Sequence, residues 1–170
     1  MKFLVSQPEL ASAIAAVKAI VPLRPTHPVL ANLLLELQGD VLNITAFDLR
    51  LGLKIELVVN GEQDGRAALP ARLFSDVISG LDGQVAIAFD EACKATITAQ
   101  SGHYSIHGME ADEFTPFPSL DEDAQILEIP TPALHLGLEK IAFAMATDET
   151  KQVLCGARFQ GGDCGEVART

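Results

Sequence analysis

The apolar positions near the amino terminus recur at helical spacing. They fall on one face of a helix and are Leu10, Ile14, Val17 and Val21. The segment Ser6-Gln7-Pro8-Glu9 has the residues of a helix start, with a serine cap, an early proline and a glutamate three positions after the serine. Pro22 ends the pattern because proline cannot continue a helix. We expect a helix over residues 8–20, whose opposite face carries the small residues Ser12, Ala15 and Ala19.

Short runs of alternating apolar and polar residues predict strands before and after this helix. The expected strands cover residues 1–6, 29–37, 41–47, 49–59, 66–69, 85–89, 93–99 and 103–107. Gly39-Asp40 is a hairpin turn, residues 61–65 form a polar loop, and residues 70–80 form a second helix that begins with a proline. Residues 110–123 contain six acids and two prolines and are expected to form an exposed edge and linker. The predicted fold class is therefore α+β.

The beginning of the chain is repeated 124 residues later. Seven pairs of positions share this offset: Pro8 and Pro132, Leu10 and Leu134, Ile14 and Leu138, Val17 and Ile141, Val21 and Met145, Val29 and Val153, Leu30 and Leu154. Two amphipathic helices can match by chance, but chance explains the Val–Leu pair beyond the loop less well. We expect one unit over residues 1–124 and a second over 125–170, with a helix over 131–146. The second copy ends without alternating strands, so we expect a truncated or disrupted version of something longer.

The charge of the chain is strongly acidic, yet the predicted helices are neutral. The formal net charge is −11, whereas a nucleic-acid-binding protein is usually basic, so a DNA hypothesis has to rest on where the charges lie. Each predicted helix carries one acid and one base; the pairs are Glu9 and Lys18, Asp76 and Arg72, Glu139 and Lys140. Half-buried helices tolerate few charges, which is one explanation. The other is that the helices face a polyanion, and composition leaves both open.

No pattern in the chain indicates catalysis, a metal site or a cofactor. Nucleophile-elbow, zinc-protease and phosphate-loop motifs are absent from the sequence. His103 and His107 are four residues apart on a predicted strand, which separates them by roughly 13 Å, too far to share one ion. The three cysteines, Cys93, Cys155 and Cys164, show no paired spacing. With neither a secretory signal nor an apolar run of about 20 residues, we expect a protein of the reducing cytoplasm.

Five segments together resemble a known family: "MKFLV", "RPTHPVLANLLLEL", "LNITAFDLRLGL", "LPARLFSDVISGL" and "HYSIHGMEADEFTPFP". They are similar to the bacterial sliding clamp, the beta subunit of DNA polymerase III, and the resemblance runs from Met1 to about Phe159. It implies a sliding-clamp fold with three similar domains per chain. Two such chains close head to tail into a homodimeric ring around duplex DNA, with antiparallel sheets outside and two helices per domain lining the channel. Residues 1–124 would be the first clamp domain and 125–170 the truncated start of the central domain, with the third domain absent.

The resemblance also implies a function. Members of the family are non-catalytic processivity factors that bind double-stranded DNA without reading its sequence and tether the replicative polymerase. Polymerase III subunits and the clamp loader are the implied partners, in the bacterial cytoplasm, and no cofactor is implied. The alternative is a small acidic α+β module that binds proteins through an exposed edge strand. A hydrolase is a third class, but the sequence offers no nucleophile–base arrangement.

The site residues implied by the resemblance fall into three sets. Arg24 lies on a loop braced by Pro22, Pro25 and Pro28 and matches a family arginine that touches DNA phosphates. Arg72 matches another family basic residue, and Lys18, the nearest cation upstream of Arg24, completes the predicted DNA-binding set. For Arg24, the alternative is a solvated loop arginine.

Two further assignments concern protein contacts. Tyr104 and Ile106 match an apolar pair on the edge strand that packs against the third domain of the partner chain, and ordinary core packing is the alternative. Leu154 matches one residue of the pocket that receives clamp-binding peptides, so it would be a remnant of that pocket. The chain departs from the family in lacking the Thr-Asp-Gly-His-Arg-Leu run, and Asp148 stands at the repeat position of Arg24. This chain is therefore not expected to encircle DNA by itself.

Overall fold

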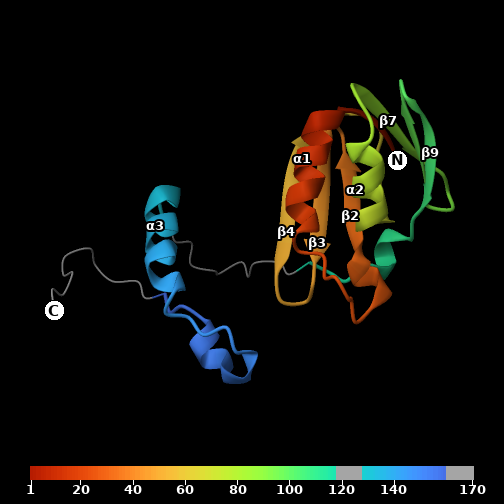
Figure 1. The fold of residues 1–170 in the computed structure, drawn as a ribbon. Helices are drawn as coiled ribbons and strands as arrows, with labels where there is room; N and C mark the ends of the chain where they lie inside the picture. The colour runs from red at the N-terminus through yellow and green to blue at the C-terminus, as the bar shows by residue number, and fades with distance from the viewer. Residues whose placement is uncertain (118–127, 160–170) are drawn as a thin grey trace. The chain divides into compact units, whose positions relative to one another are not determined.

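The computed structural model describes residues 1–117 and 128–159, which belong to two compact units. The first unit comprises residues 1–119 and the second residues 120–170. Two antiparallel sheets and two helices build the first unit (Figure 1), so the predicted α+β class is confirmed. The predicted boundary at residue 124 lies outside the described residues.

Both sheets are antiparallel throughout. The five-stranded sheet has the order β5-β1-β7-β8-β9, with β5 at Asn60–Gln63, β1 at Lys2–Ser6, β7 at Gln84–Phe89, β8 at Lys94–Ala99 and β9 at Gly102–His107. The four-stranded sheet has the order β4-β3-β2-β6, with β4 at Gly52–Val58, β3 at Val41–Phe47, β2 at Asn32–Gln38 and β6 at Gly65–Pro70. The edge strands are therefore β5 and β9 in the first sheet and β4 and β6 in the second, and β6 gains one further bridge, from Ala68 to Met109.

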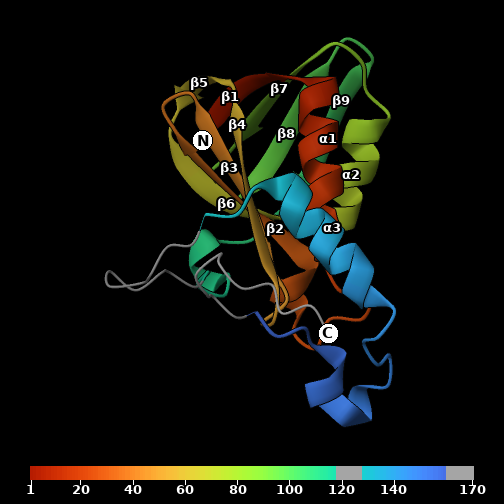
Figure 2. The same ribbon diagram turned by 90° about the vertical axis from the view of Figure 1, so that its left-hand side faces the viewer.

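Helices α1 (Gln7–Lys18) and α2 (Ala71–Ser79) lie side by side over the sheets, as Figures 1 and 2 show. The predicted apolar face of α1 is confirmed, because Leu10, Ile14 and Val17 are buried. From α2, Phe74 and Ile78 enter the same core, where they meet the inward residues of both sheets. Full burial of each such side chain stabilises the fold by about 1.5–3 kcal/mol, so this shared core holds the two helices in place.

The start of the first helix and the segment before β2 differ from the sequence predictions. Ser6 occupies the cap position of α1, but its side chain makes no capping hydrogen bond, so the predicted capping box is not formed. Residues 29–31 belong to a 3-10 helix, η1 (Pro28–Ala31), rather than to a strand. The Asn32 side chain closes this turn by donating from Nδ2 to the carbonyl oxygens of Pro28 and Val29, both at 3.2 Å. The strand therefore begins at Asn32.

Two further predictions around the β3–β4 hairpin were wrong. Residues 61–63, predicted as part of a loop, belong to β5 and pair with β1, which their polar composition concealed. The predicted strand over 49–59 begins only at Gly52, because the Asp48 carboxylate accepts the backbone N–H groups of Arg50 (2.9 Å) and Leu51 (2.6 Å) and folds the chain into a turn. These two amides, that of Leu51 first, hold the pKa of Asp48 below its usual value.

Residues 108–117, which we call the strap, lead from β9 across one end of the four-stranded sheet. Met109 exchanges two backbone hydrogen bonds with Ala68 of β6, at 2.9 and 3.0 Å. Asp112, in the short 3-10 helix η2 (Ala111–Glu113), forms an ion pair with Arg66, which is also on β6. Phe114 is buried. The predicted exposure is confirmed for most described residues of 110–117, but the segment is bonded to the sheet and buries Phe114; residues 118–123 lie outside the described residues.

The strap reaches the far edge of that sheet at Phe117. Its ring meets the ring of Phe47 edge-on, with 6.0 Å between the centroids. Gly52 of β4 is paired with Phe47 and lies directly beneath the Phe117 ring. A Cβ built at Gly52 would clash with Cε2 of that ring. A side chain at position 52 would displace the ring, so glycine is the residue that lets the strap cross β4.

The second unit reproduces the helical elements that open the first one. Helix α3 covers Thr131–Ala142, which is α1 shifted by the repeat offset of 124, and it ends four residues before the predicted end. The same shift carries η1 onto the last four residues of η3 (Glu149–Cys155). Where the structure describes side chains, α3 buries none, and every buried apolar residue lies between Met1 and Phe114. The second unit therefore lacks a core of its own in the described range.

Hydrogen exchange should separate the two equal-length helices. We expect the amides of α3 to exchange roughly a thousandfold or more faster than those of α1, because α1 is held by a buried core and α3 is not. Exchange followed by mass spectrometry on the whole chain measures both helices in one sample, with α1 as the internal control. Equal protection of the two would show that the second unit is packed.

Candidate nucleic-acid interface

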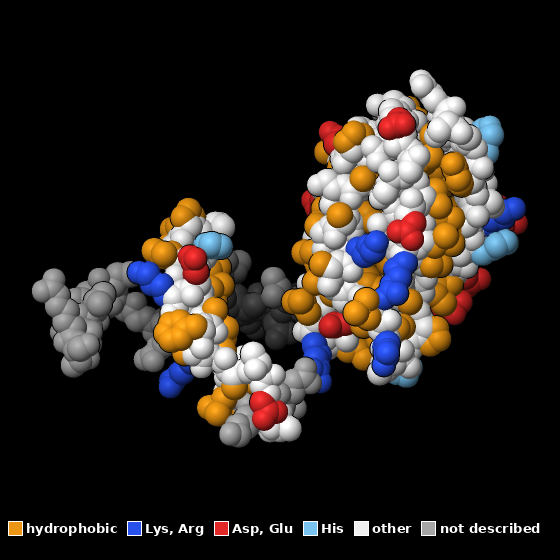
Figure 3. Space-filling model, in the orientation of Figure 1, with side chains coloured by type: hydrophobic (Ala, Val, Ile, Leu, Met, Phe, Trp, Pro, Cys, Tyr) orange, Lys and Arg blue, Asp and Glu red, His pale blue; other side chains and the backbone are white. Residues whose placement is uncertain are grey.

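The outward face of the α1–α2 pair is nearly neutral. On α1 the exposed residues along this face are small, namely Ser12, Ala15, Ala16 and Ala19. Figure 3 shows the face in the orientation of Figure 1, with Lys and Arg side chains gathered near the end of α1 and the start of α2 and only scattered acidic groups beside them. Small side chains would let an extended surface approach the helices closely.

Lys18, in the last turn of α1, is tied to α2. Its Nζ donates a hydrogen bond to Oγ of Ser75 at 3.0 Å and lies 3.8 Å from the carboxylate of Asp76. An ion pair of this exposed kind contributes about 0–1 kcal/mol. Lys18 therefore joins the two helices, and part of its charge is balanced by Asp76.

Arg72, in the first turn of α2, reaches the loop that follows α1. Its Nη2 donates to the backbone carbonyl oxygen of Leu23 at 3.3 Å. The side chain also lines a small pocket together with residues of that loop and of η1, which are Val21, Pro22, Leu23, Pro25 and Ala31. Arg72 thus lies against the segment that carries Arg24.

Arg24 itself is exposed on this loop. Among the described residues, no hydrogen bond or ion pair engages its guanidinium group. The fold therefore places Lys18, Arg24 and Arg72 at one end of the helix face, and Arg24 is the one whose charge has no partner in this part of the chain. Their roles in DNA binding stay predictions.

The edge strand β9 exposes one of its two predicted contact residues. Tyr104 is 41% exposed, but Ile106 is only 2% exposed and belongs to the core. The two share a face, as the two-residue period requires, yet that face is covered where Ile106 lies and open at Tyr104. The burial of Ile106 fits the alternative of ordinary core packing, and the role of Tyr104 and Ile106 at a ring interface stays a prediction. The position of β9 at a sheet edge agrees with the prediction.

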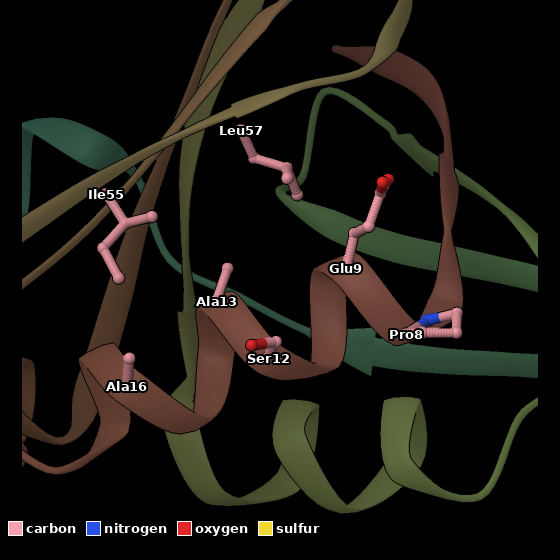
Figure 4. Close-up of a pocket in the computed structure, with 7 residues that line it drawn as sticks. All are labelled: Pro8, Glu9, Ser12, Ala13, Ala16, Ile55 and Leu57. Carbon is pink, nitrogen blue, oxygen red and sulfur yellow. The ribbon is translucent and has the colours of Figure 1, made fainter.

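Sequence reasoning missed a shallow groove between α1 and the edge strand β4. Figure 4 shows Ala13 and Ala16 of α1 facing Ile55 of β4, with Leu57 further along the strand. Pro8, Glu9 and Ser12 complete the lining. The signal available in the sequence was the alternation of Leu53, Ile55 and Leu57 opposite a helix face of small residues. An apolar lining with one carboxylate can pack against another surface but offers no catalytic pair.

The described residues also limit other kinds of site. No group of three or more His, Cys, Asp or Glu side chains in them is arranged to hold a metal ion. None of the helices in the same residues has the length and apolar character needed to cross a membrane.

Comparison with known proteins assigns the chain to a family. The model of the DNA polymerase III beta subunit, N-terminal domain, matches residues 1–120. The chain belongs to the DNA polymerase III beta subunit family. Among curated relatives, the beta sliding clamp of Synechocystis sp. is 42% identical over all of this chain and 46% of its own length. That of Synechococcus elongatus is 39% identical over 94% of this chain and 43% of its own.

Solved structures of beta subunits share the fold. The DNA polymerase sliding clamp from Bacillus subtilis superposes with a TM-score of 0.85 at 25% identity, covering 90% of this chain and 42% of that one. The sliding clamp from Caulobacter crescentus gives 0.83 at 28% identity, covering 91% and 42%. The predicted sliding-clamp fold is confirmed. The chain spans less than half the length of these relatives.

Within this beta-subunit chain, the second unit carries an acid where the first carries Arg24. The Asp148 carboxylate accepts from the hydroxyl (2.7 Å) and then from the backbone N–H (3.0 Å) of Thr150, and these bonds, the hydroxyl first, hold the pKa of Asp148 below the usual value. The Asp148 side chain therefore caps η3, and the second unit has no cation at the position that Arg24 occupies in the first. Leu154 is 57% exposed. Its assignment to a peptide pocket stays a prediction.

Replacing Ile106 or Tyr104 of β9 by alanine should lower the free energy of unfolding by very different amounts. We expect Ile106→Ala to lower the free energy of unfolding by about 2–5 kcal/mol, because it leaves a cavity in the core. Tyr104→Ala, the control on the same face, should cost within about 1 kcal/mol. Urea unfolding followed by circular dichroism gives both values. Similar costs for the two variants would contradict the burial of Ile106.

Proposed function

We propose that this chain supplies the first clamp domain and the start of the central domain of a DNA polymerase processivity factor. In its whole form, such a protein encircles duplex DNA as a head-to-tail homodimeric ring and tethers the replicative polymerase. The polymerase III subunits and the clamp loader are its proposed partners, the bacterial cytoplasm its location, and it catalyses no reaction. The observation that supports this most directly is the neutral α1–α2 face with three cations at one end, on a chain of net charge −11.

The charge arrangement suits a surface that slides along DNA. Contacts to phosphates carry no sequence information, so a few cations attract the duplex without fixing a register. The small exposed residues of α1 add no hydrogen-bonding groups that would read base edges, apart from the hydroxyl of Ser12. Attraction stays weak, and in a closed ring the topology would hold the duplex.

A second candidate function uses the edge strand. Strand β9 leaves one side of its backbone unpaired and exposes Tyr104, which favours addition of a partner strand. This module would bind proteins rather than DNA. The two functions therefore predict ligand-induced changes on different elements of the first unit.

Titration of the chain with a duplex of about 20 base pairs, followed by NMR, distinguishes the two. At about 50 mM salt we expect weak binding, with shifts confined to α1, α2 and residues 22–27, and an affinity about 4- to 60-fold lower at about 200 mM. The slope of log K against log salt should lie between about −1 and −3, since at most three cations meet phosphates.

Single variants make this experiment specific. Arg24→Ala should flatten the salt slope by about one, because one phosphate contact is lost. Arg66→Ala is the matched control, since Arg66 is an exposed arginine paired with Asp112 at the start of β6, the end of that strand that does not lead into α2. Shifts centred on β9, or tight binding at physiological salt, would contradict the proposed function.

A further inference from the structure

We propose that β9 binds an extended, acidic segment of a partner protein, and that His103 and His107 make this binding tighter as the pH falls from about 8 to about 5.5. The inference rests on the part of the proposed function in which β9 meets another protein, and it does not depend on DNA. It names the chemistry of the partner segment and makes the proton its regulator.

The strands at this edge of the sheet carry no acid, although the chain has 23 acids against 12 lysines and arginines. Strands β7, β8 and β9 contain no aspartate or glutamate and hold Lys94, His103 and His107. In the rest of this sheet, the acid on a strand is Glu62, whose carboxylate lies 2.6 Å from Nζ of Lys2. Figure 3 shows histidine side chains on the side of the first unit where Figure 1 places β9. An acidic segment that approaches this edge therefore meets no like charge on the strands.

The two faces of β9 differ in chemistry. Tyr104 and Ile106 lie on the face that packs toward α2, where Ile106 is in the core and Tyr104 is partly exposed. The two-residue period places His103, Ser105 and His107 on the opposite face, and all three are exposed. A strand added along the free side of β9 would therefore meet Tyr104 on one face and both histidines on the other.

The spacing of the histidines defines the partner segment. They are four residues apart on one face of the strand, so two acids four positions apart on an added strand can face both of them. The residues next to each of these acids then lie on the face of Tyr104 and would be apolar. The same spacing works for a parallel and an antiparallel strand, because it reads the same in both directions.

The two histidines have different neighbours on β8. Thr98 is paired with His103, and its Oγ1 lies 3.1 Å from Nδ1 of the imidazole ring. A threonine hydroxyl either donates or accepts, so this bond persists when the ring gains a proton. Nε2 of the same ring has no partner among the described residues. His107 is paired with Lys94, so a charge gained there adds to an existing cation.

The other charged groups around β9 belong to turns, to the strap and to α2. In the turn between β7 and β8, two backbone N–H groups donate to the carboxylate of Asp90, and Glu91 follows it. Glu110 lies three residues beyond β9, in the strap. Helix α2 packs against the other face of β9, and its charged residues, Arg72 and Asp76, are one of each sign. On the outer face of β8 and β9 themselves, the charge is therefore set by the lysine and the two histidines.

The direction of the pH effect follows from these charges. Histidine changes its charge between about pH 5 and 8, so the outer face carries one cation at the upper end of this range and up to three at the lower end. Glutamates of a partner stay ionised across most of the range, so acidification adds attractions without removing any. Each exposed pair of this kind changes the affinity by a factor of about one to five.

Titration of the whole chain with two extended peptides, followed by NMR, tests the inference. One peptide carries two glutamates four positions apart with a valine next to each, and the other carries lysines in place of the glutamates. We expect the acidic peptide to shift the amides of β9 and to bind about 3- to 20-fold tighter at about pH 5.5 than at about pH 8. The basic peptide should bind more weakly and lose affinity as the pH falls.

Variants assign the pH dependence to particular side chains. His103→Gln and His107→Gln keep a polar side chain that does not titrate, so each should lower the ratio of the two affinities, and the double variant should bring it to about one. Lys94→Met and Tyr104→Ala should weaken binding at both pH values without changing the ratio. His135→Gln, at an exposed position of α3, is the matched control and should change neither value. All these side chains are at least partly exposed, so none of the variants is expected to unfold the first unit.

Three outcomes overturn the inference. Equal or tighter binding of the basic peptide at both pH values would show that the edge does not select acids. A pH dependence that survives in the double histidine variant would place the proton elsewhere. If neither peptide shifts β9, this strand is not a docking edge.

The duplex titration described above distinguishes a failure of this inference from a failure of the proposed function. Acidic-peptide binding at β9 without duplex binding at the α1–α2 face would uphold the inference and contradict the DNA role. Duplex binding at that face without peptide binding at β9 would overturn the inference and leave the DNA role intact.

Discussion

Packing of α1 against α2 is the interaction on which the arrangement of the first unit depends. Polar side chains connect the helices at both ends: Gln7 Nε2 donates to the carbonyl oxygen of Ile78 at 2.9 Å, and Lys18 bonds Ser75 at the other end. Between these points, aliphatic side chains of both helices enter the core that the two sheets share. Because the pair is fixed, the face it turns outward is fixed as well, and so is the place from which Arg72 reaches the loop.

Local patterns were enough to predict much of this fold. Strand β3 and the second helix were found within a residue of their bounds, since alternation and helical spacing are properties of the segment itself. Strand β5 was missed because its residues are polar and it exists by pairing with β1, some 60 residues earlier. The burial of Ile106 was left open for a related reason. Alternation shows which residues share a face, but it does not show how far along the strand that face is covered.

The candidate site shows the same division between local and distant information. The three cations could be proposed from the sequence, and the fold brings them to one end of the helix face. Which of the three form hydrogen bonds within the protein could not be predicted, because the partners of Lys18 and Arg72 are 57 and 49 residues away in the sequence. Only the tertiary structure separates a cation engaged within the protein from one whose charge has no partner among the described residues. The strap gives a similar case, since the need for glycine at position 52 arises from the ring of Phe117.

The excess of acidic residues is consistent with a DNA-facing role once its placement is considered. In the first unit the excess of acids lies on turns, loops and the strap rather than on the strands or on α1 and α2, so a duplex that approaches those segments is repelled. The α1–α2 face is close to neutral and has its cations at one end, so a duplex that approaches it meets less repulsion than it meets at those loops. Under the proposed function, the acids would contribute by orientation: they disfavour wrong encounters, while a few weak phosphate contacts leave the duplex free to slide. In the repeat, Asp148 replaces Arg24, so the second unit would add no cation at that position.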